Sequence, residues 1–240
     1  MNKNYSIIAV LLVLAGFFVI ADNGKKYGQV DFTTSKVITQ TTTMYHHDDV
    51  YSLTRADDVA GSSATITRTD AGVGIQFNTS ELPAGAYTVW LLVYNNPEEC
   101  ADGDCDLPDI DPGTPAVSPG AIRIGQDYIS NTDGAMSITA WVPAGDTVGS
   151  EGSTLLPGSL FGSIENPMTA EFDVILKWHG KALTSGDDVD HDLLDEQLHD
   201  IQGGCFPGRA DMDPAPIELD NGFLLCPDPQ GATFVNPFAK

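Results

Sequence analysis

The longest largely apolar run beyond the N-terminal segment covers residues 86–94, between a turn at residues 82–85 and the sequence Asn95-Asn96-Pro97. Successive side chains of a strand point to opposite faces, and both faces of this run are apolar. We therefore predict a central strand that is covered on both sides, with the proline-rich residues 107–120 draped over one face. The same pattern leaves open that one face binds a ligand instead.

Alternating apolar and polar positions predict further strands. Residues 63–69 and 73–78 flank the turn Asp70-Ala71-Gly72 and predict a hairpin. Residues 171–179 predict a second core strand, with Phe172 and every second residue after it pointing inward and mostly charged side chains opposite. Shorter strand patterns lie at residues 36–43, 121–125, 136–142 and 232–238.

One short helix is predicted at residues 189–202. Leu194, Leu198 and Ile201 form an apolar stripe, and Gly203-Gly204 ends the helix. Acidic residues crowd its N-terminus, where the helix dipole favours negative charge. Beyond it, Asn221-Gly222 predicts a second tight hairpin.

Many short strands with a single helix predict a mainly β fold. We expect an antiparallel β-sandwich, immunoglobulin-like or jelly-roll-like. It forms one domain over residues 22–240, with long loops at residues 95–120 and 143–168.

The N-terminal residues 1–21 have the pattern of a secretory signal peptide. Lys3 precedes an apolar run from Ile7 to Ile20, which is shorter than the ~20 residues that span a bilayer, and cleavage is expected after Ala21. The alternative is an uncleaved N-terminal anchor. No later segment is predicted to span a membrane, so we expect a secreted or extracytoplasmic protein, in the periplasm or at the cell surface.

The net charge of the chain limits the kinds of partner that it can bind. The chain has 34 acidic against 11 basic residues, a net charge of −23. Such a surface repels nucleic acids and anionic membranes, and it favours divalent cations and basic partners. With 42% hydrophobic residues the chain can still bury a core, which excludes a disordered acidic tail.

Four cysteines in an exported chain predict disulfides. The local pairings Cys100–Cys105 and Cys205–Cys226 are favoured because each closes a short loop. The crossed pairings stay open.

The loop after the central strand is acidic. Asp102, Asp104 and Asp106 have the alternate spacing of a calcium loop, and Asp109 follows. Leu107 stands where an EF-hand requires glycine, so the loop is closer to the Asp-rich loops of extracellular calcium modules. We predict a calcium site at these four aspartates; the alternative is a solvated loop without an ion.

Histidines offer an alternative metal site for zinc or copper. His191, Asp195 and His199 share one face of the predicted helix, although the two histidines are about 12 Å apart along its axis. One of them with Asp195 could therefore share an ion with His179 or with His46-His47. The alternative is a polar helix face.

Aromatic side chains raise a third candidate, a surface for sugar rings. Trp90 and Tyr94 on the central strand are the predicted stacking residues, within a set that includes Trp141 and Trp178. Core packing is the alternative. Sequence signatures of serine hydrolases, metalloproteases, nucleotide phosphate loops and dinucleotide-binding folds do not occur, which favours a binding protein over an enzyme.

Two resemblances support this class. The strand entry Leu82-Pro83-Ala84-Gly85-Ala86-Tyr87 resembles that of immunoglobulin-like and prealbumin-like sandwiches, which implies that the tyrosine hydroxyl bonds back to an upstream backbone group. Residues 82–100, 170–183 and 195–205 resemble segments of uncharacterised secreted bacterial β-sandwich proteins, a resemblance that implies no activity.

The sequence thus predicts a binding or interaction module, calcium-stabilised if the acidic loop holds an ion, whose partner is a protein or a glycan of a surface. A metal-dependent enzyme or metal-binding protein using His179, His191 and His199, and a structural envelope component, are the alternatives.

Overall fold

The computed structural model describes residues 36–51, 54–101, 105–106, 109, 116–129, 134–145, 162–185, 188–199, 215, 217–218 and 224–239. The chain divides into two units, Met1–Thr34 and Ser35–Lys240, and the fold below is that of the second. The predicted signal peptide, residues 1–21, lies outside the described residues. Among the helices of the described part, none has the length and apolar character to cross a membrane.

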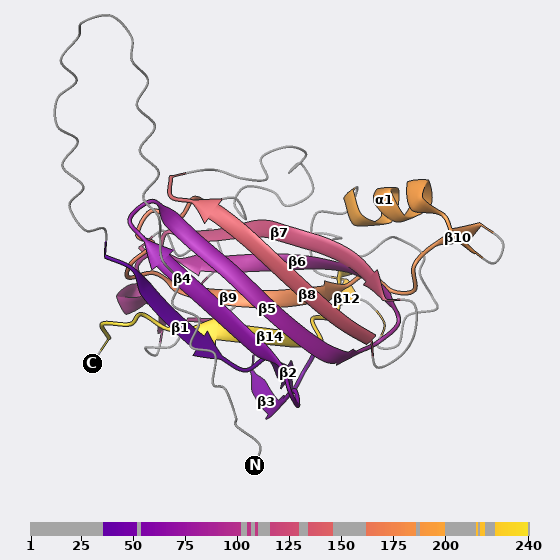
Figure 1. The fold of residues 1–240 in the computed structure, drawn as a ribbon, viewed down its shortest axis with the longest axis horizontal. Helices are drawn as coiled ribbons and strands as arrows, with labels where there is room; N and C mark the ends of the chain where they lie inside the picture. The colour runs from indigo at the N-terminus through magenta and orange to yellow at the C-terminus, as the bar shows by residue number, and fades with distance from the viewer. Residues whose placement is uncertain are drawn as a thin grey trace, which may run out of the picture. The chain divides into compact units, whose positions relative to one another are not determined.

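Two antiparallel sheets form the fold, as the alternating patterns predict (Figure 1). The four-stranded sheet has the order β1-β4-β5-β8. Its strands are β1 (Ile38–Thr42), β4 (Ser63–Thr69), β5 (Gly72–Leu82) and β8 (Gly134–Pro143). The β4–β5 pair confirms the predicted hairpin, with Thr69 opposite Gly72 at its turn.

The six-stranded sheet has the order β3-β2-β14-β9-β6-β7. Its strands are β2 (Tyr45–His47), β3 (Arg55–Asp58), β6 (Gly85–Tyr94), β7 (Pro119–Ile129), β9 (Glu171–Trp178) and β14 (Gln230–Phe234). The two predicted core strands, β6 and β9, lie side by side in its centre. Every residue of both strands is buried.

The main core lies between the two sheets, where their inward faces meet. Alternation decides which residues enter it: Val89 and Leu91 of β6 and Val174 of β9 pack against Ile75 and Phe77 of β5. The predicted inward set of β9, from Phe172 to Trp178, belongs to this core.

A second cover lies on the outer face of the six-stranded sheet, as the two apolar faces of β6 predict. Over one part of β6, Trp90 and Leu92 pack with Cys100, Cys105 and Val117 of the following loop. The helix α1 (His191–His199) covers another part, where Leu194 and Leu198 pack on Ala86. This side of β6 is covered as expected, with Val117 from the proline-rich residues 107–120, of which 107–108 and 110–115 lie outside the described residues. The helix was predicted, but its role as a cover was not.

The described helix begins two residues later than predicted, and residues 200–204 at its predicted end lie outside the described residues. Asp190 caps it, since its Oδ1 accepts hydrogen bonds from the backbone N–H groups of Asp192 and Leu193 at 3.1 and 3.2 Å. Gln197 is fully buried and donates to the carbonyl oxygen of His179 at 2.8 Å, which ties the helix to the end of β9.

Short elements complete the described part. They are the 3-10 turn η1 (Pro97–Glu99) and two small hairpins, β10 (Thr184–Ser185) with β11 (Asp188–Val189) and β12 (Ile217–Glu218) with β13 (Leu224–Leu225). The β12–β13 pairing agrees with the hairpin predicted at Asn221-Gly222, whose turn lies outside the described residues.

The strand entry contains the tie that its resemblance implies. The hydroxyl of Tyr87 donates to the carbonyl oxygen of Pro83 at 2.8 Å, four residues upstream. At the other end of β6, buried Asn95 donates to the carbonyl oxygens of Ser118 and Ser163 and accepts from the backbone N–H of Glu165 at 2.7 Å. The Asn-Asn-Pro break therefore anchors two later segments to the end of the central strand.

Candidate functional site

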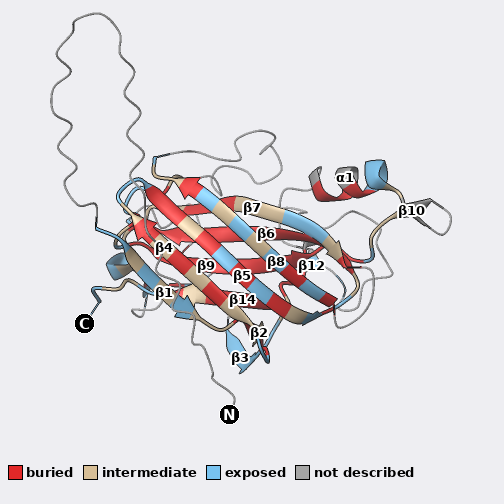
Figure 2. Ribbon diagram, viewed as in Figure 1, coloured by how far each residue is buried: buried red, intermediate tan, exposed pale blue. Residues whose placement is uncertain are grey.

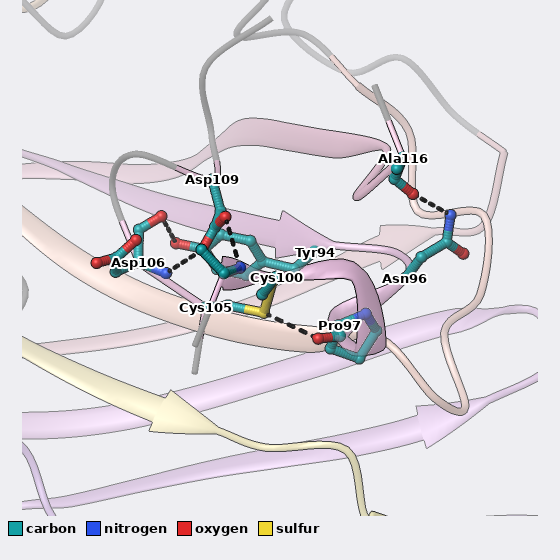
Figure 3. The surroundings of a disulfide bond; sticks show 9 residues. Tyr94, Asn96, Pro97, Cys100, Cys105, Asp106, Asp109 and Ala116 are labelled. Carbon is teal, nitrogen blue, oxygen red and sulfur yellow. Dashed lines mark hydrogen bonds between the residues drawn. A yellow bond between two sulfur atoms is a disulfide. The ribbon is translucent and has the colours of Figure 1, made fainter. Parts of the chain in front are cut away.

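The predicted disulfide between Cys100 and Cys105 is present (Figure 3). Its Cα atoms are 5.2 Å apart, and η1 leads into it from the end of β6. Both cysteines are buried against Trp90 and Leu92, so the bridge holds the loop on the outer face of the six-stranded sheet.

Asp109 organises the backbone of this loop. It is buried, and its Oδ1 and Oδ2 accept hydrogen bonds from the N–H groups of Ala101 and Asp106, each at 3.2 Å (Figure 3). The hydroxyl of Tyr94 in turn donates to the Asp106 carbonyl oxygen at 3.1 Å. One predicted calcium ligand therefore has a structural role that needs no ion.

The calcium hypothesis itself stays a prediction. Asp102 and Asp104 lie outside the described residues, and Asp106 is exposed. Among the residues that the structure describes, no three His, Cys, Asp or Glu side chains gather closely enough to hold a metal ion.

The remaining cysteines are described in part. Cys226 is buried and disulfide-bonded, whereas Cys205, its predicted partner, lies outside the described residues. The predicted pairing of these two stays a prediction.

The histidines of the alternative metal site have other contacts. Buried His179 follows β9: its Nε2 lies 2.7 Å from the Thr88 hydroxyl and its Nδ1 lies 3.5 Å from the Cys226 sulfur. Thr88 also accepts a hydrogen bond from the Trp90 indole at 2.9 Å. Both ring nitrogens of His179 therefore already have partners within the protein.

His191, at the start of α1, is exposed and lies edge-on to Tyr128, with ring centroids 6.3 Å apart. The side chains of Asp195 and His199 lie outside the described part. The described contacts of His179 and His191 are hydrogen bonding and ring packing. They do not support the alternative zinc or copper site.

A row of buried charged side chains on the outer face of β9 was not anticipated. The pattern of residues 171–179 indicates a polar face, yet Glu171, Asp173 and Lys177 are buried. Lys177 forms an ion pair with buried Asp228, at 3.0 Å between Nζ and Oδ1. These charged side chains are buried because distant parts of the chain cover the outer face of β9.

Asp173 lacks such a partner in the described part of the chain. One of its carboxylate oxygens, Oδ1, has no hydrogen bond there. Burial raises the pKa of Asp173 to about 7; hydrogen bonding with Thr233 and Tyr94 opposes the shift, and the charges of Glu171 and Asp106 add to it. The carboxyl group is therefore partly protonated at neutral pH.

This shift predicts a pH dependence. The pKa of Asp173 in the folded chain lies above the value of about 3.9 for an unfolded chain, so the folded state holds the proton more tightly. Its stabilising contribution is complete below pH ~4 and is lost as the pH rises through ~7, on the order of 4 kcal/mol. Urea unfolding of Asp173→Asn at pH 5 and pH 8 should show a smaller loss of stability with rising pH than the wild type does.

The matched control is Asp57→Asn, because Asp57 is an exposed carboxylate on β3. It should leave the difference between the two pH values unchanged. Equal pH dependence in the wild type and Asp173→Asn would show that the group does not titrate as described.

The aromatic set separates into buried and exposed members. Trp90 and Tyr94, the predicted stacking residues, are buried, as is Trp178. They cannot offer a ring face to a sugar, because the disulfide loop and the core cover them, and the prediction for these residues is corrected accordingly. Trp141 differs: 53% of its surface is exposed.

Trp141 belongs to the outer face of the four-stranded sheet, which is open in the described structure (Figure 2). Along β8 it shares this face with Ser137 and Thr139, and all three are exposed. The signal was available in the sequence, since every second residue before Trp141 is polar, whereas buried Trp178 alternates with charged residues on the opposite face.

Strand register orders this face into three rows that cross the sheet. The rows are Thr39–Thr67–Gly74–Trp141, Thr41–Thr65–Gln76–Thr139 and Ser63–Asn78–Ser137. Hydroxyl pairs cross from β1 to β4, at 3.1 Å between Thr41 and Thr65 and 3.5 Å between Thr39 and Thr67. On the next strand pair, Asn78 donates to the Ser63 hydroxyl at 2.6 Å.

These three rows, named the hydroxyl face below, contain no charged side chain. The contrast with the whole chain is large, because 45 of its 240 residues are charged, from 34 acidic and 11 basic ones. The acidic residue of β5, Glu81, lies at the irregularity between Thr79 and Leu82 and contacts His46 at 3.3 Å. The hydroxyl face is thus polar and uncharged, and it has one exposed indole.

Comparison of the chain with protein-family models, with curated proteins and with solved structures finds no match.

Proposed function

We propose that the chain is an extracytoplasmic binding module and that the hydroxyl face is its binding surface. The observation that carries the proposal is the exposed indole of Trp141 on an uncharged sheet face of a strongly acidic chain. Exposed aromatic side chains on an otherwise polar surface are typical of recognition sites, because they lose water at little cost in conformational entropy.

The choice of face follows from what covers each sheet. The outer face of the six-stranded sheet already packs against the disulfide loop and α1. The outer face of the four-stranded sheet keeps its side chains exposed or half-buried. The outer face of the four-stranded sheet is therefore the one available to a partner.

The compartment is part of the proposal. The Cys100–Cys105 bridge fits an oxidising environment, where small loops closed by disulfides persist. The signal-peptide pattern of residues 1–21 supports export to the same environment. A net charge of −23 disfavours nucleic acids and anionic membranes as partners.

Two added charges in the middle of the hydroxyl face test the proposal. The double variant Thr65→Asp with Thr139→Asp places carboxylates on either side of Gln76 in the central row. Binding of the full chain is measured by affinity electrophoresis against hydroxyethylcellulose, glucomannan and alginate, and by sedimentation with purified peptidoglycan. At least one of these should bind the wild type, and the double variant should lose at least about tenfold in affinity for it, or about 1.4 kcal/mol.

The control Ala56→Asp with Ala101→Asp adds the same charge at exposed positions away from the hydroxyl face. It should bind as the wild type does. Equal binding by both double variants would place the site elsewhere, and absence of binding to every probe would leave the structural envelope role as the better description.

A further inference from the structure

We infer that the ligand of the hydroxyl face is an uncharged polysaccharide chain that lies across the strands, an inference that rests on the proposed function and adds the ligand class to it. The three rows determine the direction in which the polysaccharide lies. Neighbouring strands are about 4.8 Å apart, so a row over four strands spans about 15 Å. That length suits several linked sugar units better than a single one.

The hydrogen-bonding chemistry of the rows matches a sugar. A Ser or Thr hydroxyl both donates and accepts, and so does each Asn or Gln amide, as does every hydroxyl of a pyranose ring. The hydroxyl groups of Thr41, Thr65 and Ser63 already take part in short side-chain pairs, which fixes their orientation before a ligand arrives. Ordered groups of this kind lose little entropy when they bind.

The indole supplies the apolar part of the interaction. One face of a pyranose ring presents mainly C–H groups, which pack on an aromatic ring. Trp141 is paired with Gly74 on the neighbouring strand, and a Cβ atom at Gly74 would lie 3.6 Å from Cε3 of the indole. Because glycine has no side chain, β5 places nothing there against the exposed indole.

Charge separates a neutral polysaccharide from other partners. An acidic polysaccharide would be repelled by a chain of net charge −23, and a basic protein would find no carboxylate in the three rows. Cores of protein interfaces are rich in aromatic and apolar side chains, whereas this face has one aromatic residue among hydroxyl and amide groups. A neutral, hydroxyl-rich polymer is the partner whose chemistry matches these side chains.

The test compares Trp141→Ala with Phe238→Ala in the full chain, since Phe238 is another exposed aromatic residue, at 47%, outside the hydroxyl face. Binding to hydroxyethylcellulose, glucomannan and alginate is measured by affinity electrophoresis. We expect the wild type and Phe238→Ala to bind a neutral polymer and not alginate, and Trp141→Ala to bind it at least about tenfold more weakly. Trp141→Tyr should retain part of the affinity, because it keeps an aromatic ring.

Trp141 also reports on binding directly. Trp90 and Trp178 are buried, so acrylamide quenching of the fluorescence reports mainly on Trp141, and the neutral polymer should protect it. If instead alginate or peptidoglycan binds and the Thr65→Asp/Thr139→Asp variant abolishes that binding, the ligand class is wrong and the proposed function stands. If neutral polymers bind Trp141→Ala as tightly as the wild type, the inference fails. If no binding depends on the hydroxyl face, both proposals fail.

Discussion

Replacing Arg68 with methionine should lower the free energy of unfolding by about 4 kcal/mol, because it breaks a buried, fully engaged charged group. Arg68 is an inward-facing residue of β4 with no exposed surface. Its Nε donates to the Gln40 side chain at 2.7 Å. Its two terminal nitrogens donate to four backbone carbonyl oxygens, those of Pro167, Ala170, Phe234 and Val235.

The guanidinium group links the two sheets. The carbonyl oxygens it binds precede β9 and end β14, both in the six-stranded sheet, and its central carbon lies 4.8 Å from the ring centroid of Phe172. Methionine fills a similar volume but leaves these acceptors without donors in a buried position, which is the costly arrangement. Lysine restores the charge but not the planar fork of donors, so Arg68→Lys should also lose at least about 2 kcal/mol.

Urea unfolding followed by tryptophan fluorescence measures these differences. Arg55→Met is the matched control, because Arg55 is an exposed arginine on β3 that pairs with Asp58. It should cost less than about 1 kcal/mol, as exposed ion pairs do. Should Arg68→Met prove too unstable to purify, Arg68→Lys and Gln40→Ala give smaller steps of the same kind. A loss in Arg68→Lys no larger than in Arg55→Met would contradict the account.

Arg68 also shows where sequence patterns lose their predictive power. The segment Ser63–Thr69 alternates clearly enough to predict a strand, and its inward set continues from Ala64 and Ile66 to Arg68. Charge alone would place an arginine outside. The carbonyl oxygens that satisfy it belong to segments about 100 and 166 residues away, and no local pattern reports them.

Local signals explain what was predictable. The period of two identifies β4, β5 and β9, a continuous apolar run identifies β6, and the short spacing of Cys100 and Cys105 identifies their bridge. The burial of Asp173 and the role of Asp109 depend on how the loop beyond β6 lies on the sheet. That position results from packing between distant residues.

In the candidate site, too, local patterns predict the strand, whereas contacts between distant strands decide its surroundings. The strand at residues 136–142 was predicted, and its alternation places Trp141 on the polar side, but that this side stays uncovered depends on which sheet β8 joins. The rows of the hydroxyl face depend on the registers of three strand pairs. A shift of one residue in any of them would turn a strand's outward set inward.

Gly85→Ala should have an effect of similar size or larger, a loss of at least about 4 kcal/mol. Gly85 begins β6 with φ of +155°, a conformation that other residues rarely adopt. A Cβ atom there would lie 2.0 Å from Nε1 of Trp178 and 2.4 Å from the carbonyl oxygen of Gly180. The indole cannot simply move away, because it is buried in the core and donates to the Ala84 carbonyl oxygen at 3.2 Å.

The consequence of that clash spreads beyond the turn. The same Gly180 carbonyl oxygen accepts a hydrogen bond from Ala86 at 2.8 Å, and the N–H of His179 donates to the carbonyl oxygen of Ala86 at 2.8 Å. Adding a methyl group therefore separates the ends of the two central strands, β6 and β9. The loss of stability should appear both in urea unfolding and in faster hydrogen exchange of the N–H groups of Ala86 and His179, which donate between the two strand ends.

Gly61→Ala separates crowding from backbone strain. Gly61 also has a positive φ, +72°, but a Cβ atom there would meet nothing within 4 Å. Its substitution should cost only about 1 kcal/mol. In the double variant Gly85→Ala with Trp178→Leu, the summed losses should exceed the measured one, because the smaller side chain removes one of the two contacts and leaves that with Gly180. Strict additivity, or equal losses in Gly61→Ala and Gly85→Ala, would mean that contact with Trp178 is not what requires glycine at the start of the central strand.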